Sequence, residues 1–200
     1  MKYEKTKNNF SLQPSALSVQ KGFTQHHSYG AGFTLMEAIV AIFLITTGIV
    51  GVLALVTQTI SSATLSTQRL TAAYLAQEGI EIVRNIRDTN WLEQYTNPAN
   101  SWDEGLTINC PGACNCPTGC IADYTYSVQS DPDLPAYADQ YLNIDGGFYS
   151  YSAGTQTKFK RKITISPSGG DILQVSVLVE WSEKGTTYQV EVQENLYNWK

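Results

Sequence analysis

Four cysteines lie within eleven residues of the chain, so thiol chemistry is the first that the sequence offers. They form two Cys-Pro-x-x-Cys loops of equal size, whose Pro-Gly and Pro-Thr-Gly turns bend the chain enough to bring paired sulfurs together. Two chemistries suit such a cluster: disulfide bonds, and a tetrahedral zinc site of four thiolates. We favour disulfides, because zinc knuckles usually separate their cysteines by about two residues, whereas the intervals here are three, one and three residues. The cluster consists of Cys110, Cys114, Cys116 and Cys120.

Four cysteines allow three sets of pairs, and the sequence disfavours one of them. Any set that joins Cys114 to Cys116 is strained, because a single residue separates the two. Pairs within each loop and crossed pairs both remain open. Either set would fasten a long loop, and either requires that this part of the chain fold outside the cytoplasm.

The second chemical feature is a carboxylate at the start of an apolar segment. Glu37 is followed by 31 residues, 38–68, of which none is charged. Within them residues 38–56 are interrupted only by two threonines and two glycines, and the threonine hydroxyls can bond back to helix carbonyls. At 1.5 Å per residue this stretch spans roughly 28 Å, close to the thickness of the hydrocarbon core of a bilayer. We therefore expect a membrane-spanning helix.

A charge at the end of such a helix needs a partner. A carboxylate there costs on the order of 2–3 kcal/mol. A cut between Gly32 and Phe33 would create an α-amino group one helical turn from Glu37, on the same chain or on a neighbouring one. Pairing of the two charges would offset the desolvation of both, and the helix dipole adds a small stabilisation of the carboxylate.

The remaining residue types do not form a catalytic set. The only two histidines precede Gly32, so no Ser/His or Cys/His arrangement would survive a cut there. A Gly-rich phosphate loop is absent from the sequence. Four aspartates offer oxygen ligands for calcium, but their spacing matches no known calcium loop, and turn formation explains them equally well. They are Asp131, Asp133, Asp139 and Asp145. We expect no enzyme activity and no resident metal or cofactor.

The charge of the chain is distributed unevenly. The first 32 residues hold four lysines and one glutamate, for a charge of +3, and the rest holds 9 basic and 17 acidic residues, for a charge of −8. An acidic main part argues against nucleic acid as a partner, because phosphate binding needs clustered cations. One basic cluster, residues 158–162, alternates along a predicted strand, and we expect it on a solvated face.

Hydrophobic periodicity predicts the elements that position these groups. After residue 56 the helical pattern continues to about Asp88, with apolar residues recurring every three to four positions on one stripe. The stripe comprises Leu65, Ala72, Leu75, Gly79, Ile82 or Val83, and Ile86. Polar residues fill the other positions: Gln68, Arg69, Gln77, Glu78, Glu81, Arg84 and Arg87.

Beyond a loop region, residues 89–123, the period changes to two. The strands expected are residues 124–128, 148–151, 159–165, 173–181 and 188–192, the last two joined by a turn at residues 183–186. We predict an antiparallel sheet that covers the helical stripe, and hence an α+β fold. The predicted division of the chain is 1–32, 33–59, 60–88 and 89–200: leader, membrane helix, amphipathic helix, and loop region with sheet.

Residues 32–37, Gly-Phe-Thr-Leu-Met-Glu, followed by the apolar run, resemble the prepilin signature of bacterial type IV pilins and of the pseudopilins of type II secretion systems. The resemblance implies that a prepilin peptidase cuts after Gly32 and methylates the new N-terminal Phe33. It also implies that Glu37 pairs with the N-terminus of an adjacent subunit. Two features depart from the family pattern: the leader is long, and the helix lacks the proline often found partway along it, so Gly48 and Gly51 are its only breakers.

The resemblance further implies the place and partners of the chain. It predicts a single-pass protein of the inner membrane with its globular part outside the cytoplasm, which then joins a pilus or pseudopilus. Its partners would be the prepilin peptidase, other pilin subunits, the inner-membrane assembly machinery and the lipid bilayer. The Cys-rich loop and small C-terminal region are more similar to a minor pilin than to a major one. Motility, adhesion, DNA uptake and secretion all remain open as roles of the filament.

Two alternatives belong to other classes. One is a filament-tip or membrane-anchored binding and adhesion module, for which Trp91, Trp102 and residues 137–151 would supply an aromatic surface. The other is a signal-anchored membrane protein that is never processed.

Overall fold

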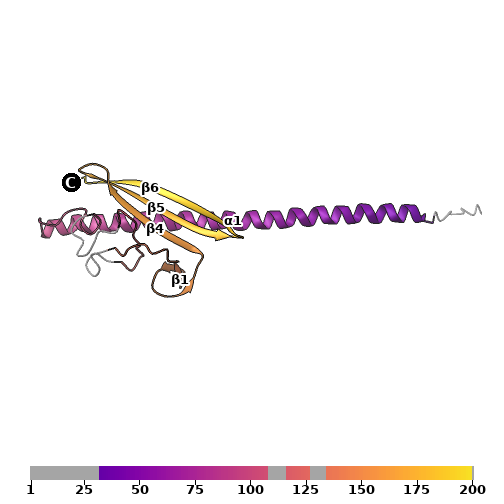
Figure 1. Ribbon diagram of the computed structural model, residues 1–200, viewed down its shortest axis with the longest axis horizontal. Helices are drawn as coiled ribbons and strands as arrows, with labels where there is room; N and C mark the ends of the chain where they lie inside the picture. Colours follow the sequence, from indigo (N-terminus) through magenta and orange to yellow (C-terminus); the bar gives the residue numbers. More distant parts are fainter. Residues whose placement is uncertain (1–31, 108–115, 127–133, 200) are drawn as a thin grey trace, which may run out of the picture. The chain divides into compact units, whose positions relative to one another are not determined.

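The computed structural model describes residues 32–107, 116–126 and 134–199, so the predicted leader, residues 1–32, lies outside the described residues except for Gly32 (Figure 1). The chain divides into two compact units, residues 1–51 and 52–200. The described residues form one long helix, α1 (Leu35–Thr96), and two antiparallel three-stranded sheets. The predicted α+β class is therefore confirmed. The strands are β1 (Asn143–Asp145), β2 (Phe148–Ser150), β3 (Thr155–Gln156), β4 (Phe159–Pro167), β5 (Ile172–Glu183) and β6 (Thr186–Tyr197).

The helix ends at Thr96, and the predicted end near Asp88 is wrong. Two further turns form because Asn90, a residue that would be expected to face solvent, is buried. Its side-chain amide donates to the carbonyl oxygens of Trp102 at 3.1 Å and Glu104 at 2.9 Å. Those bonds tie the last turns of α1 to the segment that follows, so tertiary contacts rather than a continuing apolar stripe extend the helix.

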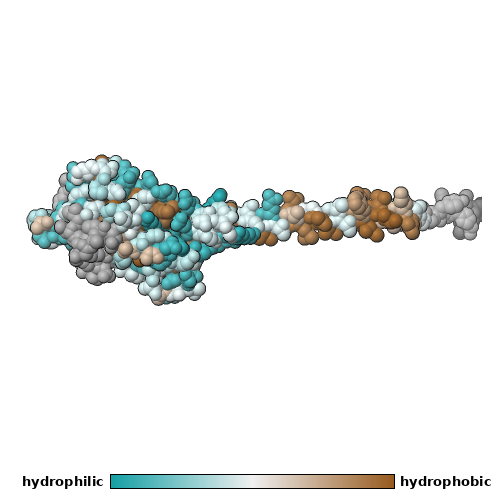
Figure 2. Space-filling model, viewed as in Figure 1, coloured by the Kyte–Doolittle hydropathy of each residue, from teal (hydrophilic) through white to brown (hydrophobic). Residues whose placement is uncertain are grey.

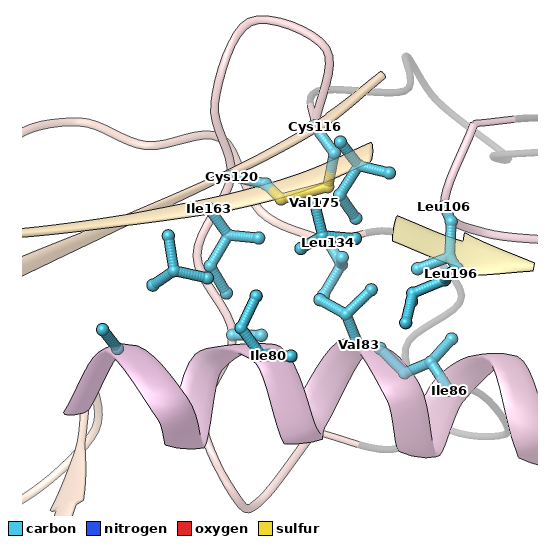
Figure 3. Close-up of a cluster of buried hydrophobic side chains, with 14 of the residues drawn as sticks. Ile80, Val83, Ile86, Leu106, Cys116, Cys120, Leu134, Ile163, Val175 and Leu196 are labelled. Carbon is cyan, nitrogen blue, oxygen red and sulfur yellow. A yellow bond between two sulfur atoms is a disulfide. The ribbon is translucent and has the colours of Figure 1, made fainter. Parts of the chain in front are cut away.

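The apolar stripe of α1 packs on the larger sheet, as predicted. Figure 3 shows Ile80, Val83 and Ile86 of the helix pointing toward side chains of the strands and of the loop that carries the cysteines. The helix and the sheet approach closely at Gly79, where a Cβ atom would lie 2.9 Å from Cγ1 of Val177. A glycine is needed there because the neighbouring valine is short and stiff. The buried residues of the stripe are Ala72, Leu75, Ala76, Gly79, Ile80, Val83 and Ile86.

Two side chains expected on the polar face of α1 are buried, which corrects that part of the prediction. Gln68 accepts a hydrogen bond from Nε1 of Trp181 at 2.9 Å and donates to Glu183 at 2.8 Å. The guanidinium of Arg87 lies 4.5 Å from the centroid of the Trp91 ring. Both are buried because each finds a partner, which a helical pattern of polar and apolar residues does not reveal.

The larger sheet has the order β4-β5-β6, and its strands coincide with three of the predicted ones. The β5–β6 hairpin turns at residues 184 and 185, between the paired residues Glu183 and Thr186, as predicted. The alternate residues of β5 form the buried face: Leu173, Val175, Val177, Val179 and Trp181. The predicted strand at residues 148–151 is β2, which belongs to the smaller sheet of order β2-β1-β3.

The strand predicted at residues 124–128 is not formed in its described part. Residues 124–126 make a turn, closed by a bond from the amide of Tyr126 to the carbonyl oxygen of Asp123 at 3.1 Å. The carboxylate of Asp123 accepts from the amides of Thr125 at 3.0 Å and Tyr151 at 2.8 Å. An aspartate that bonds the backbone two residues ahead favours a turn over an extended strand.

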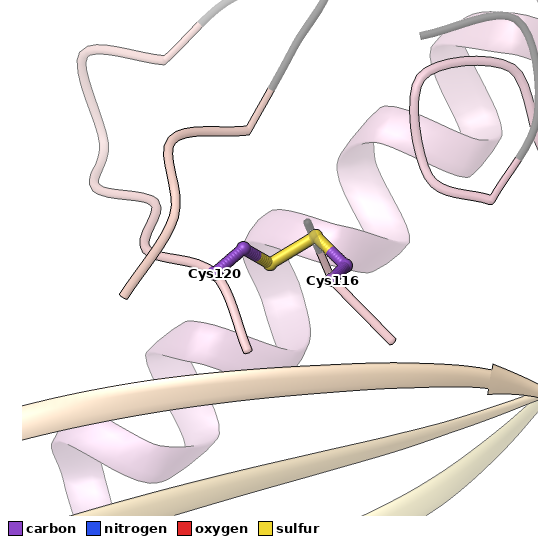
Figure 4. The surroundings of a disulfide bond; sticks show 2 residues. All are labelled: Cys116 and Cys120. Carbon is purple, nitrogen blue, oxygen red and sulfur yellow. A yellow bond between two sulfur atoms is a disulfide. The ribbon is translucent and has the colours of Figure 1, made fainter. Parts of the chain in front are cut away.

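A disulfide joins Cys116 and Cys120, whose Cα atoms lie 4.6 Å apart (Figure 4). This pair lies within one Cys-Pro-x-x-Cys loop; Cys110 and Cys114 lie outside the described residues. The disulfide loop extends the sheet beside β4. The amide of Ile163 donates to Cys120 at 2.9 Å, and the amide of Ile165 donates to Cys116 at 3.0 Å. The loop thus covers backbone groups that a bare strand edge would expose.

The basic cluster at residues 158–162 does not lie wholly on a solvated face, because Arg161 is 0% exposed. Its guanidinium donates to the carbonyl oxygens of Leu75 at 3.0 Å and Ala122 at 2.6 Å. Glu78 provides a carboxylate oxygen 3.5 Å away. Arg161 on β4 therefore joins α1, the sheet and the segment that follows the disulfide loop through one side chain. Its Nε–H makes no hydrogen bond with the described residues.

We expect Arg161→Ala to lower the free energy of unfolding by about 3 kcal/mol, because it leaves a cavity and a buried carbonyl without a donor. Arg161→Met keeps most of the volume and should cost about 1–2 kcal/mol less. Chemical denaturation of the full chain in detergent, followed by tryptophan fluorescence, measures both. The control is Lys160→Ala on the opposite face of β4, expected to change stability by less than about 1 kcal/mol. An Arg161→Ala variant as stable as this control would contradict the role given to Arg161.

Candidate functional site at the start of α1

Residues 32–37 lie where the chain enters α1. Gly32, Phe33 and Thr34 precede the helix, which begins at Leu35. Thr34 caps it: its hydroxyl oxygen accepts from the amide of Glu37 at 3.2 Å, and its carbonyl oxygen accepts from the amide of residue 38 at 3.1 Å. The helix therefore has a defined start, and the carboxylate stands at its third position.

The capping role of Thr34 was missed in the sequence, although a signal for it exists. Thr34-Leu-Met-Glu37 has the pattern Ser/Thr-x-x-Glu that is typical of a helix N-terminus. The cap orients Phe33 and Glu37 relative to the first helical turn, because it sets where that turn begins.

Within residues 32–107, 116–126 and 134–199, the carboxylate of Glu37 has no counter-charge. No ion pair among the described residues involves it, and its side chain is exposed. It lies in the first turn of α1, where the unpaired amides of the helix favour a negative charge. A cation at Phe33 would lie one turn away. The site therefore offers an acceptor for a positive group from outside the side chains described.

Neither the backbone conformation nor the packing of the described residues requires a glycine at position 32. Its φ is not positive, and a Cβ atom built on it would have no heavy atom within 4 Å. Phe33 is 81% exposed. The peptide bond between these two residues is thus free of packing against the described chain and outside regular structure.

The N-terminal part of α1, which follows this site, is apolar on all its faces. Figure 2 shows hydrophobic side chains gathered along the N-terminal part of α1. An 18-residue window of the helix is long and apolar enough to cross a membrane, and none of it is buried. The exposed large apolar residues of this part are Leu35, Met36, Ile39, Val40, Ile42, Phe43, Leu44, Ile45, Ile49, Val50, Val52, Leu53, Leu55, Val56 and Ile60. This segment is a candidate single membrane span.

The polar groups of this segment are satisfied inside the helix. The hydroxyl of Thr46 donates to the carbonyl oxygen of Phe43 at 2.9 Å, and that of Thr47 donates to the carbonyl oxygen of Leu44 at 3.0 Å. The expectation that the threonines bond back to helix carbonyls is confirmed. The helix also continues through Gly48 and Gly51, which nothing approaches within 4 Å.

The predicted calcium ligands are not brought together in the described residues. Asp139 is bound by Nζ of Lys160 at 2.5 Å and by the hydroxyl of Tyr137 at 3.0 Å. These hydrogen bonds, that of Lys160 above all, hold the pKa of the Asp139 carboxyl below its usual value. Asp131 and Asp133 lie outside the described residues. In the described ranges, no group of three or more His, Cys, Asp and Glu side chains could hold a metal ion.

The aromatic binding surface predicted for the alternative function is incomplete. Trp91 and Trp102 are buried in the core, so they offer no contact area to a partner. Tyr149 and Tyr151 pack against the core, while Tyr141 and Phe148 remain exposed.

Comparison with known proteins does not add to this geometry: no family model, no curated protein and no solved structure matches the chain.

We expect Thr34→Ala to loosen the first turn of α1, because loss of an N-cap costs about 1 kcal/mol. Hydrogen exchange of the Glu37 amide, measured by NMR on the full chain in detergent micelles, should become about fivefold faster. Thr34→Ser keeps the hydroxyl and should exchange like the wild type. Thr46→Ala, whose hydroxyl bonds within the helix, serves as the control. Unchanged exchange in Thr34→Ala would show that the cap is not used.

Proposed function

We propose that this chain is a structural subunit, a minor pilin or pseudopilin, of a type IV pilus or type II secretion-like filament. It is cut after Gly32 and assembles through the apolar part of α1. The observation that carries the proposal is the hexapeptide of residues 32–37 at the start of an exposed apolar helix. Within the described chain, no contact requires the glycine and no ion pair involves the carboxylate.

The exposure of the cleavage site supports processing. A peptidase must bind its substrate in an extended form, and Gly32 and Phe33 are exposed and precede the helix. A residue without a side chain lets the scissile peptide approach catalytic groups closely. Because the fold itself does not require Gly32, recognition by another protein is the constraint that explains it.

The distribution of charge supports assembly in register. Helices that associate in a bilayer gain little from apolar contact, because lipid tails are equally apolar. A group that fixes their relative height must then be polar. Between Phe33 and Arg69 the only charged side chain is Glu37. Pairing of this carboxylate with the α-amino group at Phe33 of an adjacent copy therefore defines a single axial register.

Location and partners follow from the same features. The charge of +3 before Phe33 favours a cytoplasmic leader, and the globular part then lies outside the cytoplasm. A disulfide between Cys116 and Cys120 agrees with an oxidising compartment. The proposed partners are the prepilin peptidase, further pilin subunits, the inner-membrane assembly machinery and the lipid bilayer.

Cleavage is tested by Gly32→Val in cells that express a prepilin peptidase. A branched side chain beside the scissile bond should prevent close approach, so the variant should retain its leader, while the wild type yields N-methylated Phe33 at its N-terminus. Mass spectrometry of the purified chain reads both. Gly30→Val, two residues earlier, is the matched control and should be processed. A wild-type chain that keeps Met1 would overturn the proposal.

Register is tested by Glu37→Val and by Glu37→Gln, which keeps the shape and removes the charge. We expect both variants to insert into membranes normally and to enter sheared filaments at least about tenfold less, since breaking an ion pair in apolar surroundings costs on the order of 3–5 kcal/mol. Immunoblots of membrane and filament fractions measure the two steps separately. Equal incorporation of Glu37→Gln would rule out the charge pairing, and loss of membrane insertion would show that the variants act earlier than assembly.

A further inference from the structure

The turn of the β5–β6 hairpin lies against α1 shortly after the apolar segment ends. Nζ of Lys184 at this turn donates to the hydroxyl oxygen of Ser61 at 2.9 Å. Beside the contact is a groove of about 430 Å³, lined by apolar parts of Ile60, Leu65 and Tyr188, by several hydroxyl groups and by Glu183. The hydroxyl-bearing residues of its lining are Ser61, Ser62, Thr64, Thr186 and Tyr188. A cation, one carboxylate, hydroxyl groups and an apolar floor thus meet at one place.

The position along α1 places this groove at the depth of lipid headgroups, provided that residues 38–56 span the membrane as the proposed function requires. Ser61 is five residues beyond residue 56, a rise of about 7.5 Å. The headgroup layer extends roughly 5–8 Å beyond the hydrocarbon on each side. Tyrosine is also typical of this layer, because its ring suits the apolar side and its hydroxyl the wet side.

The helix itself has no cation at this depth. After Glu37 its first charged residue is Arg69, about 20 Å of helix beyond residue 56. Membrane helices are commonly flanked by Lys or Arg, which interact with lipid phosphates. Here the hairpin supplies a lysine at the level where the helix lacks one.

The charge of Lys184 is only partly compensated, because the carboxylate of the adjacent Glu183 attracts it without forming an ion pair with it. The nearby carboxylate, Glu183, is bound instead by Nζ of Lys158 at 2.7 Å and by Gln68 at 2.8 Å. Of the ion pairs within residues 32–107, 116–126 and 134–199, none involves Lys184.

The backbone at Lys184 is in a conformation that disfavours lysine. Lys184 and Gly185 have φ of 51° and 80°, as in a two-residue hairpin turn of the type that favours Asn-Gly. Asparagine tolerates the left-handed region better than lysine does. Stability of the turn therefore does not explain why a lysine occupies this position, and strain of this kind points to a function of the side chain.

We propose that Lys184 and the adjoining groove bind the phosphate of an anionic phospholipid at the outer surface of the membrane. The cation and the hydroxyls of Ser61 and Thr186 suit a phosphate group, and the apolar floor suits the glycerol and upper acyl region. The contact holds the globular part against the bilayer while the subunit is stored there. A second copy of the chain is a poorer fit, because no apolar floor is needed to bind an acidic protein surface.

The test uses the full chain in nanodiscs of phosphatidylcholine alone and of phosphatidylcholine with 30% phosphatidylglycerol. Hydrogen–deuterium exchange of residues 183–187 should be about fivefold slower in the anionic nanodiscs, the effect of one cation near an anionic surface. High salt should abolish the difference. Lys184→Asn should remove it as well, while its thermal unfolding midpoint equals or exceeds that of the wild type. Lys162→Gln removes the same charge farther along β4 and should behave like the wild type.

Exchange of residues 38–56 in the same samples separates this inference from the function on which it rests. If those residues are protected in both lipids while the hairpin tip exchanges equally in both, the lipid site is wrong and the span stands. If the tip is protected in both lipids but only when a nanodisc holds several copies, the occupant is a second chain and the lipid site is again wrong. If residues 38–56 are unprotected, the membrane span fails and the inference fails with it.

Discussion

The lack of charge from residue 38 to residue 68 is the constraint on which the rest depends. A helix without charges has nothing to fix its depth in a membrane or its height against another helix, because apolar contacts are interchangeable along its length. Whatever fixes these positions must come from its two ends. At the start, the group that we propose is Glu37 in a capped first turn. At the far end, the proposed group is Lys184 of the β5–β6 hairpin, since the helix has no cation of its own there.

In the globular part, a different set of interactions holds the sheet on one face of α1. Apolar packing covers most of this face, but buried polar side chains fix how the parts meet. Arg161 donates to carbonyl oxygens of α1 and of the segment after the disulfide loop, and Gln68 bonds to Trp181 and Glu183. Such bonds are directional, so a shift of the sheet along the helix would leave buried groups without partners. The hairpin that carries Lys184 is thereby held at a defined height on α1.

The sequence predicted those features that depend on periodicity or on a local motif. Alternation along β5 identified its buried face, the helical stripe identified the face of α1 that packs on the sheet, and residues 32–37 stood out as a motif. Features that depend on long-range partners were missed. Arg161 follows the same alternation as Phe159 and Ile163, which would predict a buried side chain. Its charge instead favoured a position exposed to solvent. The helix α1 continues beyond its predicted end because the side chain of Asn90 bonds to carbonyl oxygens that only the folded chain brings near. The turn at Asp123 depends likewise on the amide of Tyr151.

The two charged ends of the apolar segment have opposite consequences for a subunit that leaves the membrane. In the assembly that we propose, Glu37 gains a partner only when a second copy arrives, so its desolvation favours assembly. In the proposed lipid contact, Lys184 has its partner in the bilayer, so this contact favours storage and must be broken before the globular part can leave the lipid surface. The lipid contact is at the exposed surface and is weakened by salt, whereas the carboxylate pairs in apolar surroundings where screening is slight. Under this proposal the stronger interaction becomes available only on assembly, which explains how one chain is held reversibly in the membrane and firmly in a filament.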